Sequence, residues 1–174
     1  MQKKEDYVVL VDEEDNPIGE MEKMEAHEKA LLHRAFSIFV FNRKGEMLLQ
    51  RRALTKYHSG GLWTNTCCSH PRPKESVQEA AHRRLGEEMG FDCELEVKFS
   101  FVYKVDFDNG LAEHEFDHVL LGEYEGRVVP NRDEVHETKY MSLPELRNEI
   151  KNNSSQFTFW FLIAFEELEK YLIK

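Results

Sequence analysis

Two cysteines and a histidine stand close together in GGLWTNTCCSHPRPKE, the segment from Gly60 to Glu75. Cys67 and Cys68 are adjacent, and His70 follows two residues later. A thiol near an imidazole is compatible with half of a zinc site, with a redox pair, or with a catalytic thiol beside a metal ligand. A disulfide between the neighbours is disfavoured, because its geometry needs Cα atoms further apart than adjacent residues allow. The three cysteines of the chain therefore make no disulfide framework.

A second group of ionisable side chains occupies the segment EHEFDH. Side chains alternate along a strand, so Glu113, Glu115 and Asp117 are predicted on one face, with His114 and His118 on the other. Carboxylates that point the same way inside a sheet are costly unless a cation or a proton lies between them. Taken alone, the segment is more typical of an edge strand whose charges stay in water.

Histidines elsewhere in the chain strengthen the metal interpretation. His27, His33 and His70, together with two carboxylates of the strand, would make a five-ligand site of nitrogen and oxygen atoms. Such a site suits Zn, Mn, Fe or Co, whereas a structural zinc site is tetrahedral. No spacing rule links these segments, so the residue types by themselves leave the site open.

Charged residues of both signs alternate in RRLGEEMGF. Glu87 and Glu88 lie one helical turn from Arg83 and Arg84, which predicts surface ion pairs. With Glu75 near the start of the same helix, these carboxylates also form a pattern that holds Mg²⁺ against a diphosphate. Both interpretations stay open at this point.

The segments that position these residues combine strands with two or three helices. YVVLVDEEDNPIGEMEK predicts two strands around an acidic turn, and HRAFSIFVFNRKGEMLLQRR predicts a hairpin. Two further strands are predicted on either side of a turn at residues 108–110. The order predicts a single α+β domain, residues 1–174, built as an α/β/α sandwich with a mixed sheet.

The predicted helices have recognisable ends. Ser76 with Glu79 forms a capping box that opens a helix, and Gly90 suits its C-terminal stop. Ser142 with Glu145 forms a second box before a short helix at LPELRNEI. An aromatic-rich amphipathic helix is predicted around residues 157–172.

Composition and charge restrict the function classes. The net charge of −10 argues against a general nucleic-acid binder, which would have a basic face. The N-terminus lacks a signal-peptide pattern, and the longest apolar run, residues 157–165, is about half of the ~20 residues that a membrane helix needs. We therefore expect a cytoplasmic protein without a membrane partner. A monomer is expected as well, since the sequence shows no large apolar stripe that would need to be buried against a second protomer.

Residues 69–91, SHPRPKESVQEAAHRRLGEEMGF, resemble the Nudix box, whose pattern is G-x5-E-x7-R-E-U-x-E-E-x-G-U with U aliphatic. Two positions depart from it. Ser69 stands where the first glycine belongs, and Arg84 stands where Nudix hydrolases have a glutamate that helps to hold metals. The arginine suggests a diphosphate that is bound but not cleaved. The matching positions are Glu75, Arg83, Leu85, Glu87, Glu88 and Gly90.

The box and its surroundings resemble the type I isopentenyl-diphosphate delta-isomerases of the Nudix superfamily. The matching segments run from about residue 22 to residue 161 and include TNTCCSHP, FTFWF and an EHE placed ten residues after Tyr103. The resemblance implies a Nudix-type sandwich. It also implies that the protein interconverts isopentenyl and dimethylallyl diphosphate, in isoprenoid biosynthesis, by protonation and deprotonation through a tertiary carbocation.

The same resemblance implies a role for each matching residue. The ligands of one tightly bound divalent metal, Mn, Zn or Mg, would be His27, His33, His70, Glu113 and Glu115. The acid/base groups would be Cys68 and Glu115, with Tyr103 beside the glutamate and Trp160 against the carbon skeleton. The diphosphate would be contacted by Lys23, Arg52, Lys56 and Arg84, and the Mg²⁺ that accompanies it by Glu88.

Two alternative functions are also considered, and several residues are expected to have only a structural role. The first alternative is a Nudix hydrolase that cleaves a nucleoside or other diphosphate. The second is a non-catalytic zinc domain with Cys67, Cys68 and His70 as ligands. Apart from the resemblance, Tyr103 and Trp160 would be ordinary core aromatics. We expect no functional role for Cys67, His58 or His82, and Arg51 and Arg83 are expected to point away from the diphosphate.

Overall fold

Nine strands form one mixed sheet in the part of the chain that the computed structural model describes, residues 7–56 and 58–173. Residues 1–6, 57 and 174 of the predicted domain lie outside the described residues. The strands are β1 (Tyr7–Val11), β2 (Pro17–Glu22), β3 (His33–Phe41), β4 (Glu46–Arg52), β5 (Trp63–Thr64), β6 (Cys67–Ser69), β7 (Leu95–Asp106), β8 (Ala112–Glu123) and β9 (Val135–Ser142). The helices are α1 (Lys23–Glu28), α2 (Val77–Met89), α3 (Leu143–Asn153) and α4 (Phe159–Leu172), with a 3₁₀ turn at Ser154–Gln156.

The centre of the sheet is a parallel pair, β3 with β8, in a sheet whose other strand pairs are antiparallel. The register of this pair sets His33 opposite Glu115. On its other side, β3 pairs with β6, which sets Ser37 opposite Cys68. Three segments that are distant in the sequence therefore meet at β3, and each contributes a predicted site residue.

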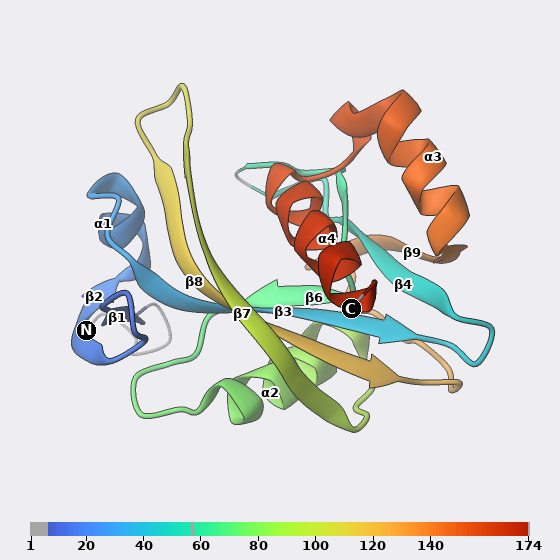
Figure 1. The fold of residues 1–174 in the computed structure, drawn as a ribbon, viewed down its shortest axis with the longest axis horizontal. Coiled ribbons are helices and arrows are strands. Elements are labelled where there is room, and N and C mark those ends of the chain that lie inside the picture. Colours follow the sequence, from blue (N-terminus) through green and yellow to red (C-terminus); the bar gives the residue numbers. More distant parts are fainter. Residues whose placement is uncertain (1–6, 57, 174) are drawn as a thin grey trace.

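The predicted hairpin of β3 and β4 forms only at its turn. Gly45 closes the turn by donating its amide to the Asn42 carbonyl at 2.9 Å, and Phe41 pairs with Met47. Beyond that point the strands separate, as Figure 1 shows, because β3 continues beside β8 while β4 pairs with β9. The predicted hairpin is therefore confirmed at its turn, while tertiary partners replace the local pairing along the rest of both strands. The predicted β7–β8 hairpin is confirmed along its length.

Helices cover both faces of the sheet and enclose two cores. On one face α2 packs Leu85 and Met89 against residues such as Ile38, and on the other α4 packs Phe161 and Leu168 against Phe39. Consecutive residues of β3 thus face opposite layers, as strand alternation requires. The predicted α/β/α sandwich with a mixed sheet is confirmed. Among the described helices, none is long and apolar enough to cross a membrane.

The helix ends follow the predicted chemistry. Both capping boxes form, at Ser76–Glu79 and at Ser142–Glu145, and Gly90 ends α2 in the left-handed conformation with φ of 72°. The sequence did not predict α1, whose six residues are too few to show a helical period. Glu22 caps α1 by accepting hydrogen bonds from the amides of Met24 and Glu25.

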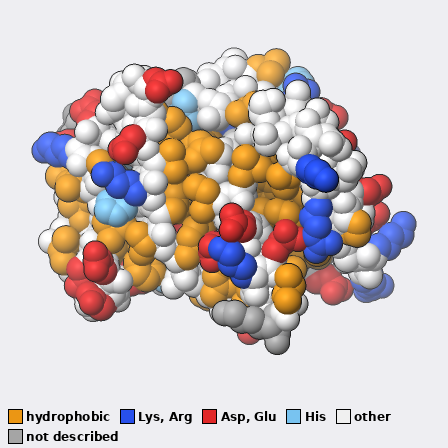
Figure 2. Space-filling view, turned by 45° about the horizontal axis from the view of Figure 1, so that its top comes forward, with side chains coloured by type: hydrophobic (Ala, Val, Ile, Leu, Met, Phe, Trp, Pro, Cys, Tyr) orange, Lys and Arg blue, Asp and Glu red, His pale blue; other side chains and the backbone are white. Residues whose placement is uncertain are grey.

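One face of the molecule keeps apolar side chains at its surface. Figure 2 shows them gathered over the middle of that face, where charged side chains border and interrupt them. Large hydrophobic residues that stay exposed include Val97 and Val102 of β7 and Leu172 at the end of α4.

Candidate active site

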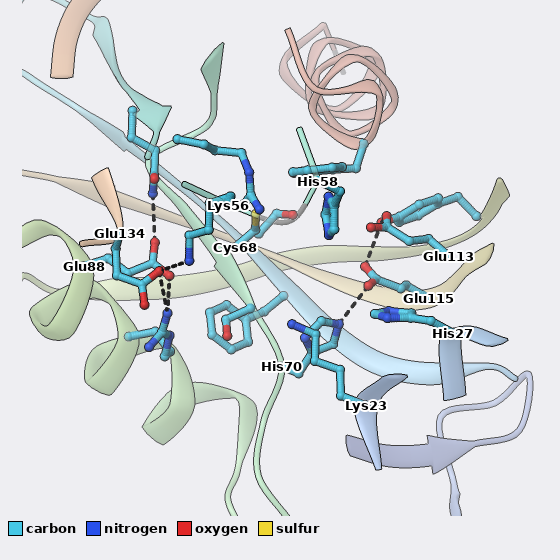
Figure 3. Close-up of a pocket in the computed structure, with 18 residues that line it drawn as sticks. Lys23, His27, Lys56, His58, Cys68, His70, Glu88, Glu113, Glu115 and Glu134 are labelled. Carbon is cyan, nitrogen blue, oxygen red and sulfur yellow. Dashed lines mark hydrogen bonds and ion pairs between the residues drawn. The ribbon is translucent and has the colours of Figure 1, made fainter. Parts of the chain in front are cut away.

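A pocket with about 780 Å³ of empty volume brings the predicted site residues together. All of them line it except His33, which is fully buried with its ring 5.0 Å from that of His27 and 5.1 Å from that of His70. Figure 3 shows acidic, basic and imidazole side chains pointing into this one space.

One end of the pocket holds a group of metal-ligating side chains. His27, His33, His70 and Glu115 each offer an atom within 4.8 Å of the others. The Nε2 atoms of His27 and His33 are buried and have no hydrogen-bond partner. His33 Nδ1 donates to the Leu31 carbonyl at 2.8 Å, which leaves the Nε2 lone pair directed away from that bond. Buried nitrogens without a partner are costly, and a divalent cation would satisfy them.

The protonation states of the side chains at this end of the pocket also favour the binding of a cation. Burial lowers the pKa of His27 to about 3 and that of His70 to about 4, so both rings are neutral, which is the form that binds a metal. Burial opposes ionisation of Glu115, but His70 and His33 hold the pKa of this carboxyl well below its usual range. His27 and His70 therefore present neutral imidazoles beside the Glu115 carboxylate and the buried ring of His33.

Glu113, the fifth predicted ligand, lies beside this group and is not part of it. The Tyr103 hydroxyl is 2.9 Å from Glu113 Oε2 and 2.7 Å from Glu115 Oε2, so it bridges the two carboxyl groups. Burial and the neighbouring Glu115 raise the pKa of Glu113 to about 8. The predicted contact between Tyr103 and the glutamate is present in the structure, whereas a ligand role for Glu113 stays a prediction.

The two adjacent cysteines occupy different environments. Cys67 is fully buried in the core beneath α2, where its Sγ lies 3.5 Å from Glu88 Oε2. Cys68 faces the opposite way and lines the pocket. Burial raises the pKa of the Cys68 thiol to about 12 against the opposing effect of Arg52, so the thiol keeps its proton at neutral pH. Among the described residues, the metal-ligating group contains neither cysteine, which removes the geometric basis for the alternative zinc domain.

The opposite end of the pocket is cationic. Arg84 pairs with Glu88 and, at 2.7 Å, with Glu87. Gln50 Nε2 donates to Glu88 Oε2 at 2.9 Å and to the Thr66 carbonyl at 2.8 Å, which holds the Glu88 carboxylate in place. Ion pairs were predicted for the helix, but Glu88 is only 7% exposed and belongs to the pocket rather than to the surface.

Aromatic rings close the pocket on the side of α4. The guanidinium of Arg52 lies 5.0 Å from the Trp160 ring centroid. The His58 ring meets Trp160 edge-on at 5.7 Å. Trp160 thus has one face toward a cation, a geometry in which the ring quadrupole is attractive.

Some residues that line the pocket were not predicted from the sequence. No role was expected for His58, and Gln50, Ser37 and Glu134 had no sequence signal, yet all four line the pocket. A polar residue within a strand or loop has no spacing signal of its own, so only the fold reveals it. Arg51 and Arg83, which were expected to point away from the diphosphate, do not line the pocket. Arg51 donates to the Gly61 carbonyl, and Arg83 pairs with Glu75.

Comparisons with known proteins agree with this geometry. Residues 31–161 match the family model described as the NUDIX domain. The chain is 53% identical over 164 residues to isopentenyl-diphosphate Delta-isomerase 2 of Aromatoleum aromaticum, covering 94% of this chain and 87% of that protein. It is 54% identical over 157 residues to isopentenyl-diphosphate Delta-isomerase of Burkholderia multivorans, covering 90% and 89%.

Solved structures show the same fold at lower identity. A protein of Deinococcus radiodurans superimposes with a TM-score of 0.70 at 18% identity, covering 84% of this chain and 90% of that one. A MutT protein of Methanosarcina mazei superimposes with a TM-score of 0.67 at 20% identity, covering 82% and 96%. At these identities the likeness concerns the fold alone. The family match and the curated relatives together show that the chain belongs to the isopentenyl-diphosphate delta-isomerases, an enzyme family built on the NUDIX domain.

Proposed function

We propose that the protein interconverts isopentenyl diphosphate and dimethylallyl diphosphate. The observation that supports this most directly is that one pocket combines several cations with acid/base groups and an aromatic ring. The cations suit a diphosphate, and the acid/base groups with the aromatic ring suit a short alkene. The curated relatives bear the name of this activity over nearly the whole chain.

The cationic end would bind the diphosphate. Arg52, Lys56 and Arg84 line the pocket there, and their donors match the acceptor oxygens of a phosphate. Lys23, the fourth proposed contact, lines the pocket near His70 and would approach the diphosphate from the other end (Figure 3). Mg²⁺ that accompanies the diphosphate would be held by Glu88, whose carboxylate Gln50 orients. Arg84, in place of the glutamate of Nudix hydrolases, adds a positive charge where a hydrolase would gather metal, which favours binding over cleavage.

The acid/base groups would act from two strands that flank β3. Cys68 is on β6 and Glu115 is on β8, so a flat alkene between them meets a proton donor and a proton acceptor. One carbon gains a proton, a tertiary carbocation forms, and a neighbouring carbon loses a proton to the second group. Tyr103 holds the Glu115 carboxyl in position through its 2.7 Å hydrogen bond.

Two features would stabilise the charged intermediate and the acid/base pair. The aromatic ring of Trp160 would attract the carbocation intermediate, an interaction worth about 0.5–2 kcal/mol. A divalent metal in the His27, His33, His70 and Glu115 group would supply fixed positive charge that favours the ionised carboxyl. Glu113 is the proposed fifth ligand. A cytoplasmic location and a monomeric state are the remaining proposals.

Incubation with isopentenyl diphosphate and Mg²⁺, followed by detection of dimethylallyl diphosphate, tests the proposed function. We expect turnover by the native protein and a loss of at least ~10²-fold in kcat for Cys68→Ala and for Glu115→Gln, since each removes one acid/base group. Cys67→Ala is the matched control, because its thiol lies in the core, and it should keep most of the activity.

Two outcomes would contradict the proposal. Release of phosphate or a monophosphate from candidate diphosphates would favour the hydrolase alternative. Native-like turnover by Cys68→Ala would remove the thiol from the reaction.

A further inference from the structure

Glu134 is a second carboxylate at the cationic end of the pocket. It lies just before β9, where its carboxylate pairs with the Lys56 ammonium and lies 3.9 Å from Nη2 of Arg84. Glu88 pairs with the same guanidinium. Lys56, Glu88 and Glu134 converge in Figure 3. Two carboxylates and two cations therefore alternate around the place proposed for the diphosphate.

The backbone around Glu134 is anchored to both segments that provide these cations. The Glu134 carbonyl accepts a hydrogen bond from the Ala53 amide at 3.0 Å, at the start of the loop that contains Lys56. The amide of Asn131 donates to the Glu88 carbonyl at 2.8 Å, near the end of α2. The Glu134 amide in turn donates to the Asn131 carbonyl at 3.0 Å. This anchoring fixes the carboxylate between the loop and the helix.

The Glu134 carboxylate is also ionised and only partly exposed. Burial works against ionisation, but the hydrogen bond from Lys56 and the charges of Lys56, Arg84 and Arg52 lower the pKa of Glu134 below its usual value. The side chain is 27% exposed, so water screens its charge incompletely. An anion that enters this end of the pocket must approach a fixed negative charge.

We propose that Glu134 sets the charge selectivity of the pocket, so that diphosphate complexed with magnesium is favoured over the free anion. Free diphosphate is highly charged and must compete with Glu134 for Lys56 and Arg84. The magnesium complex has a lower net negative charge and brings a cation that both carboxylates attract. Glu134 thus repels the free diphosphate anion but does not disfavour binding of the magnesium complex. This inference rests on the proposed function, because it concerns the same diphosphate site.

Calorimetric binding of inorganic pyrophosphate tests the inference on the metal-loaded protein, with and without added Mg²⁺. The native protein should bind pyrophosphate more tightly with Mg²⁺. In Glu134→Gln we expect the affinity for free pyrophosphate to rise by about tenfold, because a like charge is removed, while the affinity for the magnesium complex stays equal or falls. The ratio of the two affinities should therefore shrink. Glu134→Asp keeps the charge and should retain most of the ratio.

Glu137→Gln is the matched control, since Glu137 lies on β9 with a side chain 53% exposed and 3.6 Å from Arg51, outside the pocket. It should leave the ratio unchanged. A merely structural role for Glu134 would weaken both affinities together, and an unchanged ratio in Glu134→Gln would overturn the inference while leaving the proposed function intact. A native protein that binds no pyrophosphate under either condition would contradict both.

Discussion

Single residues differ in how much of their role is visible in the sequence. The alternation of strand side chains correctly placed Glu113, Glu115 and Asp117 together, since all three are buried. Alternation also explains why Cys67 enters the core while Cys68 lines the pocket. Glu134 had no such signal, because an acidic residue in a polar turn is ordinary and only tertiary contacts bring it beside Lys56.

The ion pair of Glu75 with Arg83 gives a residue-scale prediction about pH. Burial raises the pKa of Glu75, but the hydrogen bonds from Arg83 and the Arg72 amide outweigh it and lower the pKa below the ordinary 4.5. A carboxyl whose folded pKa is depressed adds stability above its unfolded pKa and loses it as the pH falls through the folded value. In urea unfolding, the native protein should exceed Glu75→Gln in stability at pH 7, and the difference should shrink below about pH 4.5. A difference that grows with acidity would contradict this.

Secondary-structure elements were predictable where local chemistry decides them and unpredictable where distant partners do. The capping box and Gly90 fix both ends of α2 from neighbouring residues alone. The β3–β4 pairing is limited to the turn because β8 and β9, far along the chain, pair with the rest of the two strands. The short helix α1, which positions Lys23 and His27, has no period long enough to detect.

The C-terminal stop of α2 gives an element-scale prediction. Gly90 has φ of 72°, and a Cβ there would lie 2.0 Å from the Val129 carbonyl oxygen. Gly45 has a similar φ of 74° with nothing within 4 Å of its Cβ position. Gly45→Ala should therefore lower the free energy of unfolding only by the cost of holding an alanine in the left-handed backbone conformation, about 1–2 kcal/mol. Gly90→Ala should lower it by more, because the backbone at Val129 must also move.

Chemical denaturation of both glycine variants measures the two costs. Equal losses of stability would mean that the close approach of residue 129 to the helix end contributes nothing. Because the segment at residues 129–131 donates hydrogen bonds to the Met89 and Glu88 carbonyls, Gly90→Ala should also weaken pyrophosphate binding.

At the scale of the whole molecule, the domain and its layers followed from the order of helices and strands, but the central pairing did not. Nothing local specifies that β3 and β8 lie parallel, and this pairing sets His33 opposite Glu115. The residue types therefore suggested candidate metal ligands, and only the family resemblance singled out the set of five. The structure adds that α1, β3, β8 and the segment after β6 each provide one member of the group.

A metal that joins four segments should stabilise the whole fold. Removal of divalent cations by a chelator should lower the melting temperature, and Zn²⁺ or Mn²⁺ should restore it, since a ligand at 100 times its Kd adds about 2.7 kcal/mol. His33→Ala should abolish this metal-dependent shift in a thermal melt. His114→Ala is the control, because His114 bonds the Ala30 carbonyl outside the group, and it should keep the shift. A shift that survives in His33→Ala would contradict the assigned ligand set.

The parallel pairing of β3 with β8 also has a consequence for how the chain reaches its native state. The buried hydrogen bond from Ser37 to Asp117 spans 80 residues of sequence. Contacts of such long range require a large loop to close before they contribute stability, which slows folding. During synthesis, His27, His33 and His70 leave the ribosome well before Glu115, so the incomplete chain presents imidazoles to metal ions while their carboxylate partner is still missing. The group of His27, His33, His70 and Glu115 is therefore complete only after β8 has been synthesised.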